Sequence, residues 1–119
     1  MFLNGSFRVT EYGYTYKKDG RFEPISDWFS GVIHYGESGF MSVIMRFKKN
    51  PETLKDVVGY SGSYKISGDE ISHHVTMSVR PEYDNETLVR KFKFIDQETL
   101  ELEFENTDEF RKYAVWKKV

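Results

Sequence analysis

An alternation with a period of two, running through residues 60–79, constrains the fold more than any other feature of the sequence. Every second position on both sides of a turn at residues 67–69 is apolar or aromatic, apart from one glycine and one histidine. These positions are Tyr60, Gly62, Tyr64 and Ile66, then Ile71, His73, Val75, Met77 and Val79. The spacing is typical of two half-buried strands in a tight hairpin. The predicted cross-strand pairs are Ile66–Ile71, Tyr64–His73, Gly62–Val75 and Tyr60–Met77.

Six further segments have strand character and bring the predicted total to eight: residues 5–16, 30–35, 40–47, 87–95, 99–105 and 111–119. Residues 17–29 resemble a turn and loop, and Asn50-Pro51 predicts one short helical turn over residues 51–57. No helix is long enough to cover a sheet, so the apolar face of the sheet has to be buried on itself. We therefore predict an all-β fold, an eight-stranded antiparallel up-and-down β-barrel with at most one short helix. Its interior is either filled by side chains or holds one small ligand.

Composition narrows the class of protein. The 119 residues fit a single domain spanning residues 1–119. Cysteine is absent, which fits a reducing compartment, so we expect a cytoplasmic protein without disulfides. The first residues have neither the basic nor the apolar region of a signal peptide, and no apolar stretch is long enough to span a bilayer. The net charge of −2, with both signs mixed, argues against nucleic acid and membrane partners.

Extending the hairpin register places a cation inside the barrel. Pairing Val79 with Leu88 gives the strand at residues 87–95 an inward face that contains Leu88, Arg90, Phe92 and Phe94. Met77 then lies beside Arg90, and His73 lies beside Phe94. On the next strand the acidic positions point outward, which requires a turn of odd length at residues 96–98. Those positions are Glu101, Glu103 and Glu105.

The first predicted strand and the hairpin that follows it supply further inward positions. Met41, Val43 and Met45 form the more apolar face of residues 40–47. Pairing Tyr35 with Phe40 then places Val32 and His34 on the same face. Upstream, a stripe of Tyr12, Tyr14 and Tyr16 lies opposite to Phe7 and Val9. Either this stripe is a dimer surface or a bulge near Gly13 exchanges inside and outside, and we favour the bulge.

The inward arginine is informative because a buried guanidinium without a partner is very costly. The candidate inward carboxylates are Glu11, Glu23 and Asp27. Two interpretations stay open. In the first, one of these acids or the mouth of the barrel satisfies Arg90. In the second, an acidic group of a ligand, such as a carboxylate or phenolate, does so.

The predicted ligand-binding residues are His34, Tyr60, Tyr64, His73, Met77, Arg90, Phe92 and Phe94. The first hypothesis is that a monomer or homodimer binds a small, largely apolar ligand with an acidic or polar group inside the barrel. The second is an isomerase- or cyclase-type enzyme that uses the same cavity, with His73 or His34 as proton shuttle. The third is a filled barrel that acts as a dimer or partner-binding domain. We predict no cofactor and no metal site, and the sequence singles out no catalytic residue.

Five short motifs, in this order, cover nearly the whole chain: Gly5-Ser6-Phe7-Arg8-Val9, Gly39-Phe40-Met41-Ser42-Val43, Tyr60-Ser61-Gly62-Ser63-Tyr64, Ile71-Ser72-His73-His74-Val75 and Arg90-Lys91-Phe92. In these motifs the chain resembles the small bacterial and fungal lipocalin-like domain proteins. Phe7 replaces the tryptophan of the Gly-x-Trp opening that is typical of lipocalins. The resemblance implies a calycin-like barrel with an internal cavity, and it does not imply one particular activity.

Overall fold

The computed structural model describes residues 3–48 and 56–119, which form nine strands and one short 3-10 helix. In chain order these are β1 (Gly5–Tyr16), β2 (Phe22–Pro24), β3 (Trp28–Tyr35), β4 (Phe40–Lys48), β5 (Asp56–Ser67), β6 (Glu70–Ser78), η1 (Pro81–Tyr83), β7 (Thr87–Asp96), β8 (Thr99–Asn106) and β9 (Phe110–Lys118). In this part of the chain no α-helix occurs, and no helix is long and apolar enough to cross a lipid bilayer. The helical turn predicted over residues 51–57 lies outside the described residues, except for residues 56 and 57, which open β5.

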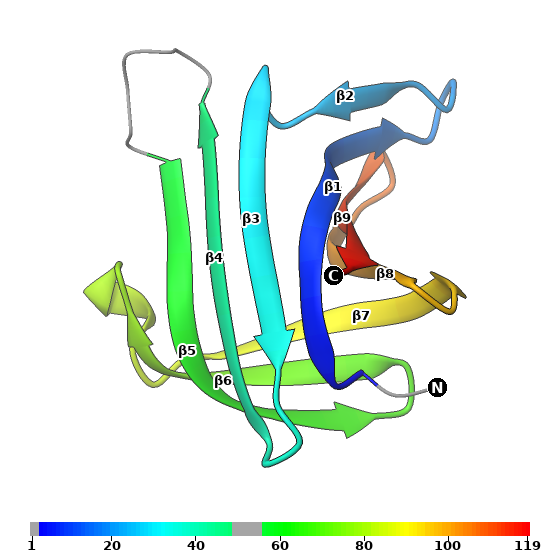
Figure 1. Cartoon of the computed structure of the whole chain (residues 1–119). Coiled ribbons are helices and arrows are strands. Elements are labelled where there is room, and N and C mark those ends of the chain that lie inside the picture. The colour runs from blue at the N-terminus through cyan, green and yellow to red at the C-terminus, as the bar shows by residue number, and fades with distance from the viewer. Residues whose placement is uncertain (1–2, 49–55) are drawn as a thin grey trace.

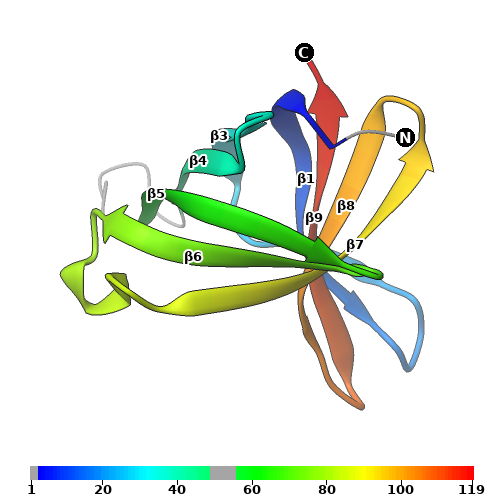
Figure 2. The ribbon, with the colours of Figure 1, turned by 90° about the horizontal axis from the view of Figure 1, so that it is seen from below.

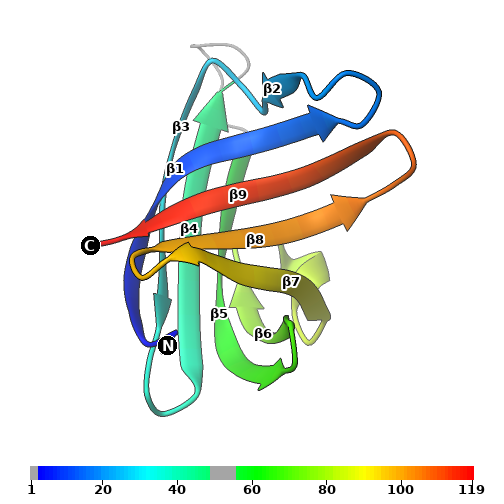
Figure 3. The same cartoon turned by 90° about the vertical axis from the view of Figure 1, so that its right-hand side faces the viewer.

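Eight of the strands close into an antiparallel barrel. Each strand from β3 to β8 pairs with the strand that follows it in the chain, and β1 pairs with β3. The pairing of β1 with β9 closes the sheet. Figure 3 shows β1, β9, β8 and β7 side by side, crossing in front of β4 and β5. The predicted eight-stranded barrel is therefore confirmed. Closure satisfies the sheet edges that an open sheet of this size would expose.

The short strand β2 is an addition to the barrel, within a segment that we had predicted to be loop. It pairs only with the second half of β1, from Gly13 to Thr15, while β3 pairs with the first half of β1, from Gly5 to Arg8. A Cβ atom on Gly13 would overlap the backbone of β2, so the glycine permits this close pairing. Figure 1 shows β2 beside the end of β1, with β6 and β7 running across the direction of β3 and β4.

The central hairpin has the predicted register only near its turn. Ile66 pairs with Ile71, Tyr64 with His73 and Gly62 with Val75, as predicted. Beyond Gly62 the register shifts by one residue, and Thr76 is the extra residue of a bulge on β6. Tyr60 therefore pairs with Ser78 rather than Met77, and the side chain of Met77 is 66% exposed. The prediction for Met77 was wrong because a bulge reverses the inward and outward positions that follow it.

The predicted pairing of β6 with β7 was also wrong. His73 pairs with Leu88 and Ile71 with Arg90, so Val79 has no part in this ladder. Arg90 still points inward, since it lies on the same side of its strand as the half-buried Leu88 and Phe92. The odd-length connection that we expected after β7 is present as a bulge at Ile95, between the pairs Phe94–Leu100 and Asp96–Thr99.

The hairpin of β3 and β4 corrects the placement of His34. Tyr35 pairs with Met41 rather than Phe40, so Ile33 and Tyr35 face the core. Val32 and His34 consequently lie on the outer face and are exposed. Met41, Val43 and Met45 form the inward face as predicted, with exposed fractions of 7% or less.

The tyrosine stripe on β1 does mark an exchange of inside and outside. The exchange occurs at Thr10, which is the extra residue between the pairs Val9–Trp116 and Glu11–Val115. Phe7 and Val9 are buried before this bulge, and Tyr12 is buried after it. The predicted bulge is therefore present, but it lies at Thr10, three residues before Gly13.

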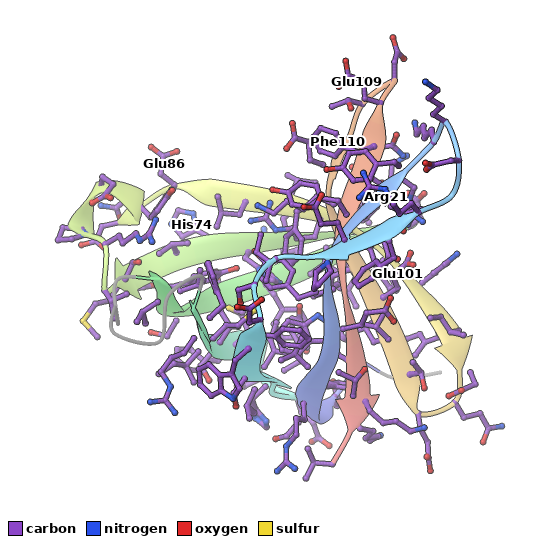
Figure 4. The ribbon with its side chains drawn as sticks, turned by 90° about the horizontal axis from the view of Figure 1, so that it is seen from above. Arg21, His74, Glu86, Glu101, Glu109 and Phe110 are labelled. Carbon is purple, nitrogen blue, oxygen red and sulfur yellow. The ribbon has the colours of Figure 1, made fainter. Side chains whose placement is uncertain are left out.

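Glu101 and Glu103 of β8 lie on the side opposite to the buried Leu100 and Leu102, as predicted for the outer face. The predicted alternation ends there, because Phe104 is the extra residue of a bulge and the exposed Glu105 pairs with Lys112 of β9. Glu101 is nevertheless only 8% exposed, because Arg111 of β9 covers it. The guanidinium of Arg111 donates hydrogen bonds to Glu101 at 2.8 Å and to Glu103 at 2.6 Å. In Figure 4 Glu101 is labelled beside β8, apart from Arg21, Glu109 and Phe110, which gather where the β1–β2 and β8–β9 turns meet.

Side chains fill only one half of the barrel. The end that carries the β3–β4, β5–β6 and β7–β8 turns contains a continuous apolar cluster that includes Leu3, Phe7, Tyr35, Met41, Ile71, Leu100 and Trp116. Phe92, Phe94 and Tyr64 pack against this cluster. The opposite end, where β4, β6 and β8 finish, is hollow. Figure 2, a view from below, shows β5 and β6 on one side and β8, β9 and β1 on the other, with β7 running from beside β6 to beside β8.

Candidate functional site

A cavity of about 270 Å³ occupies the hollow half of the barrel. Its walls are mostly apolar or aromatic, from every barrel strand, and its polar lining is concentrated in a few side chains. The lining residues are Tyr12, Ile33, Val43, Met45, Phe47, Val58, Gly59, Tyr60, His73, Ser78, Arg80, Tyr83, Leu88, Arg90, Leu102, Phe104, Lys112 and Trp116. A largely apolar concave pocket with a few convergent polar groups is the usual form of a small-molecule site.

Three cations line this cavity, and no carboxylate does among the described residues. Arg80 follows the end of β6, Arg90 lies in the middle of β7, and Lys112 lies near the start of β9. Neither arginine forms an ion pair within residues 3–48 and 56–119. The electrostatic field inside the cavity therefore favours an anion.

Arg90 extends across the lining of the cavity. Its guanidinium carbon lies 4.9 Å from the centroid of the Phe104 ring, so the cation stacks on an aromatic face. Nη1 donates a long hydrogen bond of 3.4 Å to the carbonyl oxygen of Val89. Nε is buried and has no hydrogen-bond partner in the described part of the chain. A buried donor without an acceptor is uncommon in folded proteins.

A chain of three side chains forms the floor of the cavity. The His73 ring lies between two phenols, with Nε2 at 2.6 Å from the hydroxyl oxygen of Tyr35 and Nδ1 at 2.7 Å from that of Tyr60. His73 is 1% exposed, and Tyr35 is completely buried beneath it. Tyr60 and His73 line the cavity, whereas Tyr35 does not. Adjacent strands position this chain, since β3, β4, β5 and β6 follow one another in the sheet.

All three members of the chain are uncharged near neutral pH. Burial, with a further contribution from the positive charge of Arg90, lowers the pKa of His73 to about 3. Burial raises the pKa of Tyr60 to about 12, although Arg90 beside it opposes this rise by its charge and by hydrogen bonding. Burial also raises the pKa of Tyr35 well above its usual value of 10. A neutral imidazole between two neutral phenols can donate one hydrogen bond and accept one.

Tyr12 and Trp116 complete the walls that face this floor. Burial raises the pKa of Tyr12 to about 12, while Arg90 and Arg80 act in the opposite direction. The indole of Trp116 is 1% exposed, and its Nε1 has no hydrogen-bond acceptor among the residues that the structure describes.

The structure brings together only three of the eight predicted ligand-binding residues at the cavity, namely Tyr60, His73 and Arg90. Tyr64, Phe92 and Phe94 point inward but pack in the filled half, where the Tyr64 hydroxyl donates a 2.7 Å hydrogen bond to the carbonyl oxygen of Gly36.

The two remaining predicted residues, His34 and Met77, lie on the outer surface. The His34 ring contacts the Ser6 hydroxyl at 2.9 Å, with Nδ1 and Oγ as the bonded atoms. Both placements were wrong for the same reason, a pairing register that differs by one residue from the predicted one.

Sequence reasoning missed Tyr12, Arg80, Tyr83, Lys112 and Trp116. A signal for Arg80 was available in Gly62, because a glycine within a strand often marks a bulge that changes the inward positions. Lys112, Ala114 and Trp116 are every second residue along β9, so the period of two would have placed all three on one face. Tyr83 lies in η1, where no strand periodicity applies.

The described residues hold no group of three or more histidine, cysteine, aspartate or glutamate side chains that could bind a metal ion. His73 uses both ring nitrogens in contacts with phenols, which leaves neither nitrogen available as a ligand. The arrangement is suited to holding an organic anion rather than a cation.

Comparison with known proteins gives one relationship. A search of curated proteins finds no significant match to the chain. The lipocalin-like domain family matches residues 48–119, which comprise the last residue of β4 and all of the barrel from β5 to β9. The match covers more than half of the chain, and the closed eight-stranded barrel described above continues it through β1, β3 and β4. The chain therefore belongs to the lipocalin-like domain family.

Proposed function

We propose that this protein binds a small, largely apolar molecule that carries one acidic group, and that it holds this molecule in the hollow half of the barrel. A lipocalin-like barrel is consistent with ligand binding in general. The acidic group would lie beside Arg90, and the apolar part would contact the aromatic walls. Tyr60 and His73 would orient the ligand from the floor.

The unbalanced positive charge of the cavity carries this proposal. Arg80 and Arg90 line a space to which no described carboxylate contributes, and neither arginine forms an ion pair among the described residues. Two opposite charges 4 Å apart attract by about 4 kcal/mol at the effective dielectric constant of a partly buried site. A ligand carboxylate beside the Arg90 guanidinium would gain this attraction.

The volume limits the size of the ligand. The cavity of about 270 Å³ lies just below the range of roughly 300–1,000 Å³ that is usual for drug-sized ligands. A closed apolar cavity of about 150 Å³ is enough to bind benzene. The ligand would therefore have the size of about two fused rings, and 2-naphthoate is a suitable probe.

The pKa of His73 favours binding over proton-transfer catalysis. A general base works best with a pKa near the operating pH, and burial with the nearby Arg90 lowers the pKa of this histidine to about 3. The other proposed shuttle, His34, lies on the outer surface. Neither residue supports the isomerase- or cyclase-type alternative.

Calorimetric titration with matched pairs of ligands tests the proposal. The wild-type protein should bind 2-naphthoate at least tenfold more tightly than 2-naphthalenemethanol, which has the same rings and no charge. Arg90→Leu should weaken 2-naphthoate binding by about 10–100-fold. It should also raise the free energy of unfolding by about 1 kcal/mol, because it removes a partly buried cation that has no ion-pair partner among the described residues.

Arg8→Leu is the matched control, since Arg8 lies exposed on the outer face of β1. This variant should bind 2-naphthoate like the wild type. Equal affinity for the acid and the alcohol, or full 2-naphthoate affinity in Arg90→Leu, would refute the proposal.

A further inference from the structure

We infer that the Tyr60 hydroxyl donates its hydrogen bond into the cavity, that Tyr35 sets this direction through His73, and that the ligand group bound there is an acceptor without a proton of its own. This inference rests on the proposed function and narrows the ligand to a carboxylate or a similar oxyanion. It follows from counting hydrogen atoms along the Tyr35–His73–Tyr60 chain.

Tyr35 is the most deeply buried of the three hydrogen-bonded side chains. Its side chain has no exposed surface, and His73 Nε2 is the hydrogen-bond partner of its hydroxyl in the described part of the chain. A phenol has one hydrogen to donate, and leaving that hydrogen buried without an acceptor is costlier than leaving a lone pair unused. Tyr35 therefore donates to Nε2, and Nε2 carries no hydrogen.

The single hydrogen of a neutral imidazole must then be on Nδ1. His73 is 1% exposed and lies near the cationic Arg90, and both conditions disfavour a charged ring. Nδ1 lies 2.7 Å from the Tyr60 hydroxyl oxygen, so the ring donates its hydrogen to that oxygen. The two hydrogen bonds therefore run in one direction: Tyr35 donates to His73, and His73 donates to Tyr60.

Tyr60 is left with a hydrogen that has to point elsewhere. Its neighbour Arg90 has only donors and cannot accept it. Because Tyr60 lines the cavity, the remaining direction for the hydroxyl hydrogen is into that space. The opposite chain direction would leave the Tyr35 hydrogen without a partner and would turn a lone pair of Tyr60 towards the ligand.

The arginines that line the cavity, Arg80 and Arg90, present donors only, whereas the phenols of Tyr12 and Tyr83 can donate or accept. The Ser78 hydroxyl is already occupied, since it donates to the carbonyl oxygen of Gly59 and accepts from the backbone nitrogen of Arg80. A carboxylate could accept from the Tyr60 hydroxyl and from the Arg90 guanidinium at once, and it has no hydrogen of its own that would face them.

The tautomer of His73 is directly measurable by NMR on the full chain. In a long-range nitrogen–proton correlation spectrum at neutral pH, Nδ1 should have the shift of a protonated nitrogen and Nε2 that of an unprotonated one. The variants His34→Gln and His74→Gln assign the signals, because both residues are exposed. A proton on Nε2, or on both nitrogens, would overturn the inference even if carboxylates bind.

Ligand binding supplies the second measurement. Tyr60→Phe should reduce the affinity for 2-naphthoate by about 10–100-fold and should change the affinity for 2-naphthalenemethanol by less than about threefold. Tyr113→Phe is the matched control, since its hydroxyl bonds to Thr15 at 2.7 Å and it does not line the cavity. It should leave both affinities unchanged.

The outcomes separate this inference from the proposed function. If Arg90→Leu loses 2-naphthoate affinity but Tyr60→Phe retains or improves it, Tyr60 presents a lone pair, and only the inference fails. If the wild type binds 2-naphthoate no more tightly than 2-naphthalenemethanol but His73 carries its proton on Nδ1, the hydrogen-bond direction is correct and the proposed anionic ligand is wrong. Loss of affinity in Tyr60→Phe together with the Nδ1 tautomer supports the inference in full.

Discussion

Acid should destabilise this protein through a single buried histidine well above the pH at which most carboxylates are protonated. His73 has a pKa of about 3 in the folded state because burial and Arg90 disfavour its charged form. In the unfolded chain its pKa is about 6.5. Between these two values the unfolded state binds one more proton than the folded state, so the free energy of unfolding falls as the pH falls.

The size of this effect follows from the two pKa values. The slope approaches about 1.4 kcal/mol per pH unit below pH 6.5, which gives a loss of about 2 kcal/mol between pH 7 and pH 5. A domain of this size is stable by only about 5–15 kcal/mol, so the loss is large enough to measure. The contribution is complete above pH 6.5 and is lost progressively towards pH 3.

Urea unfolding followed by tryptophan fluorescence at pH 7, 6 and 5 measures the loss, with His73→Gln as reference. Glutamine can accept from Tyr35 and donate to Tyr60 but does not titrate. The other titratable residues are the same in both proteins, so their contributions cancel in the difference. The wild type should lose about 2 kcal/mol more than His73→Gln. Parallel pH profiles for the two proteins would show that His73 is not held neutral by its surroundings.

Two further substitutions test the packing that supports the site. Arg111→Leu should lower the free energy of unfolding by about 1–3 kcal/mol in chemical denaturation, because Glu101 and Glu103 both lose the guanidinium that donates to them. Lys93→Met should cost less than about 0.5 kcal/mol, since its Nζ lies 3.9 Å from the Glu101 carboxylate on a side chain that is 64% exposed; equal costs would contradict this reasoning. Gly62→Ala should cost at least about 3 kcal/mol by the same assay, because a Cβ there would overlap the carbonyl oxygen of His74. Wild-type stability in this variant would show that the bulge on β6 does not need a glycine.

The barrel itself was predictable because its signal is repeated along the chain. Period-two alternation recurs in every long strand, and short turns impose antiparallel neighbours, so local patterns and global closure agree. The pairs nearest a tight turn were predicted correctly for the same reason, as in Ile66–Ile71 and Tyr64–His73. β2 was missed because three exposed residues carry no alternation to detect.

The site was less predictable because it depends on positions far from the turns. A register error of one residue near a hairpin turn is carried to the end of the strand, as the outward placement of His34 shows. Arg90 and His73 were found because a charged or polar residue on an apolar face is conspicuous in sequence. Lys112 and Arg80 were missed because their faces are mixed, and only the pairing of the strands decides which side is inside.

The bulge on β6 links this register problem to the cavity. Without the extra residue Thr76, the regular alternation of β6 would carry Met77 into the barrel interior. The bulge instead turns Ser78 and Arg80 towards the interior, and both line the cavity. In a regular strand, the flexible apolar side chain of Met77 would lie beside Tyr60 and fill part of the cavity. Arg80 would then no longer line the cavity. One inserted residue therefore accounts for the presence of Arg80 at the cavity and for the absence of Met77 from it.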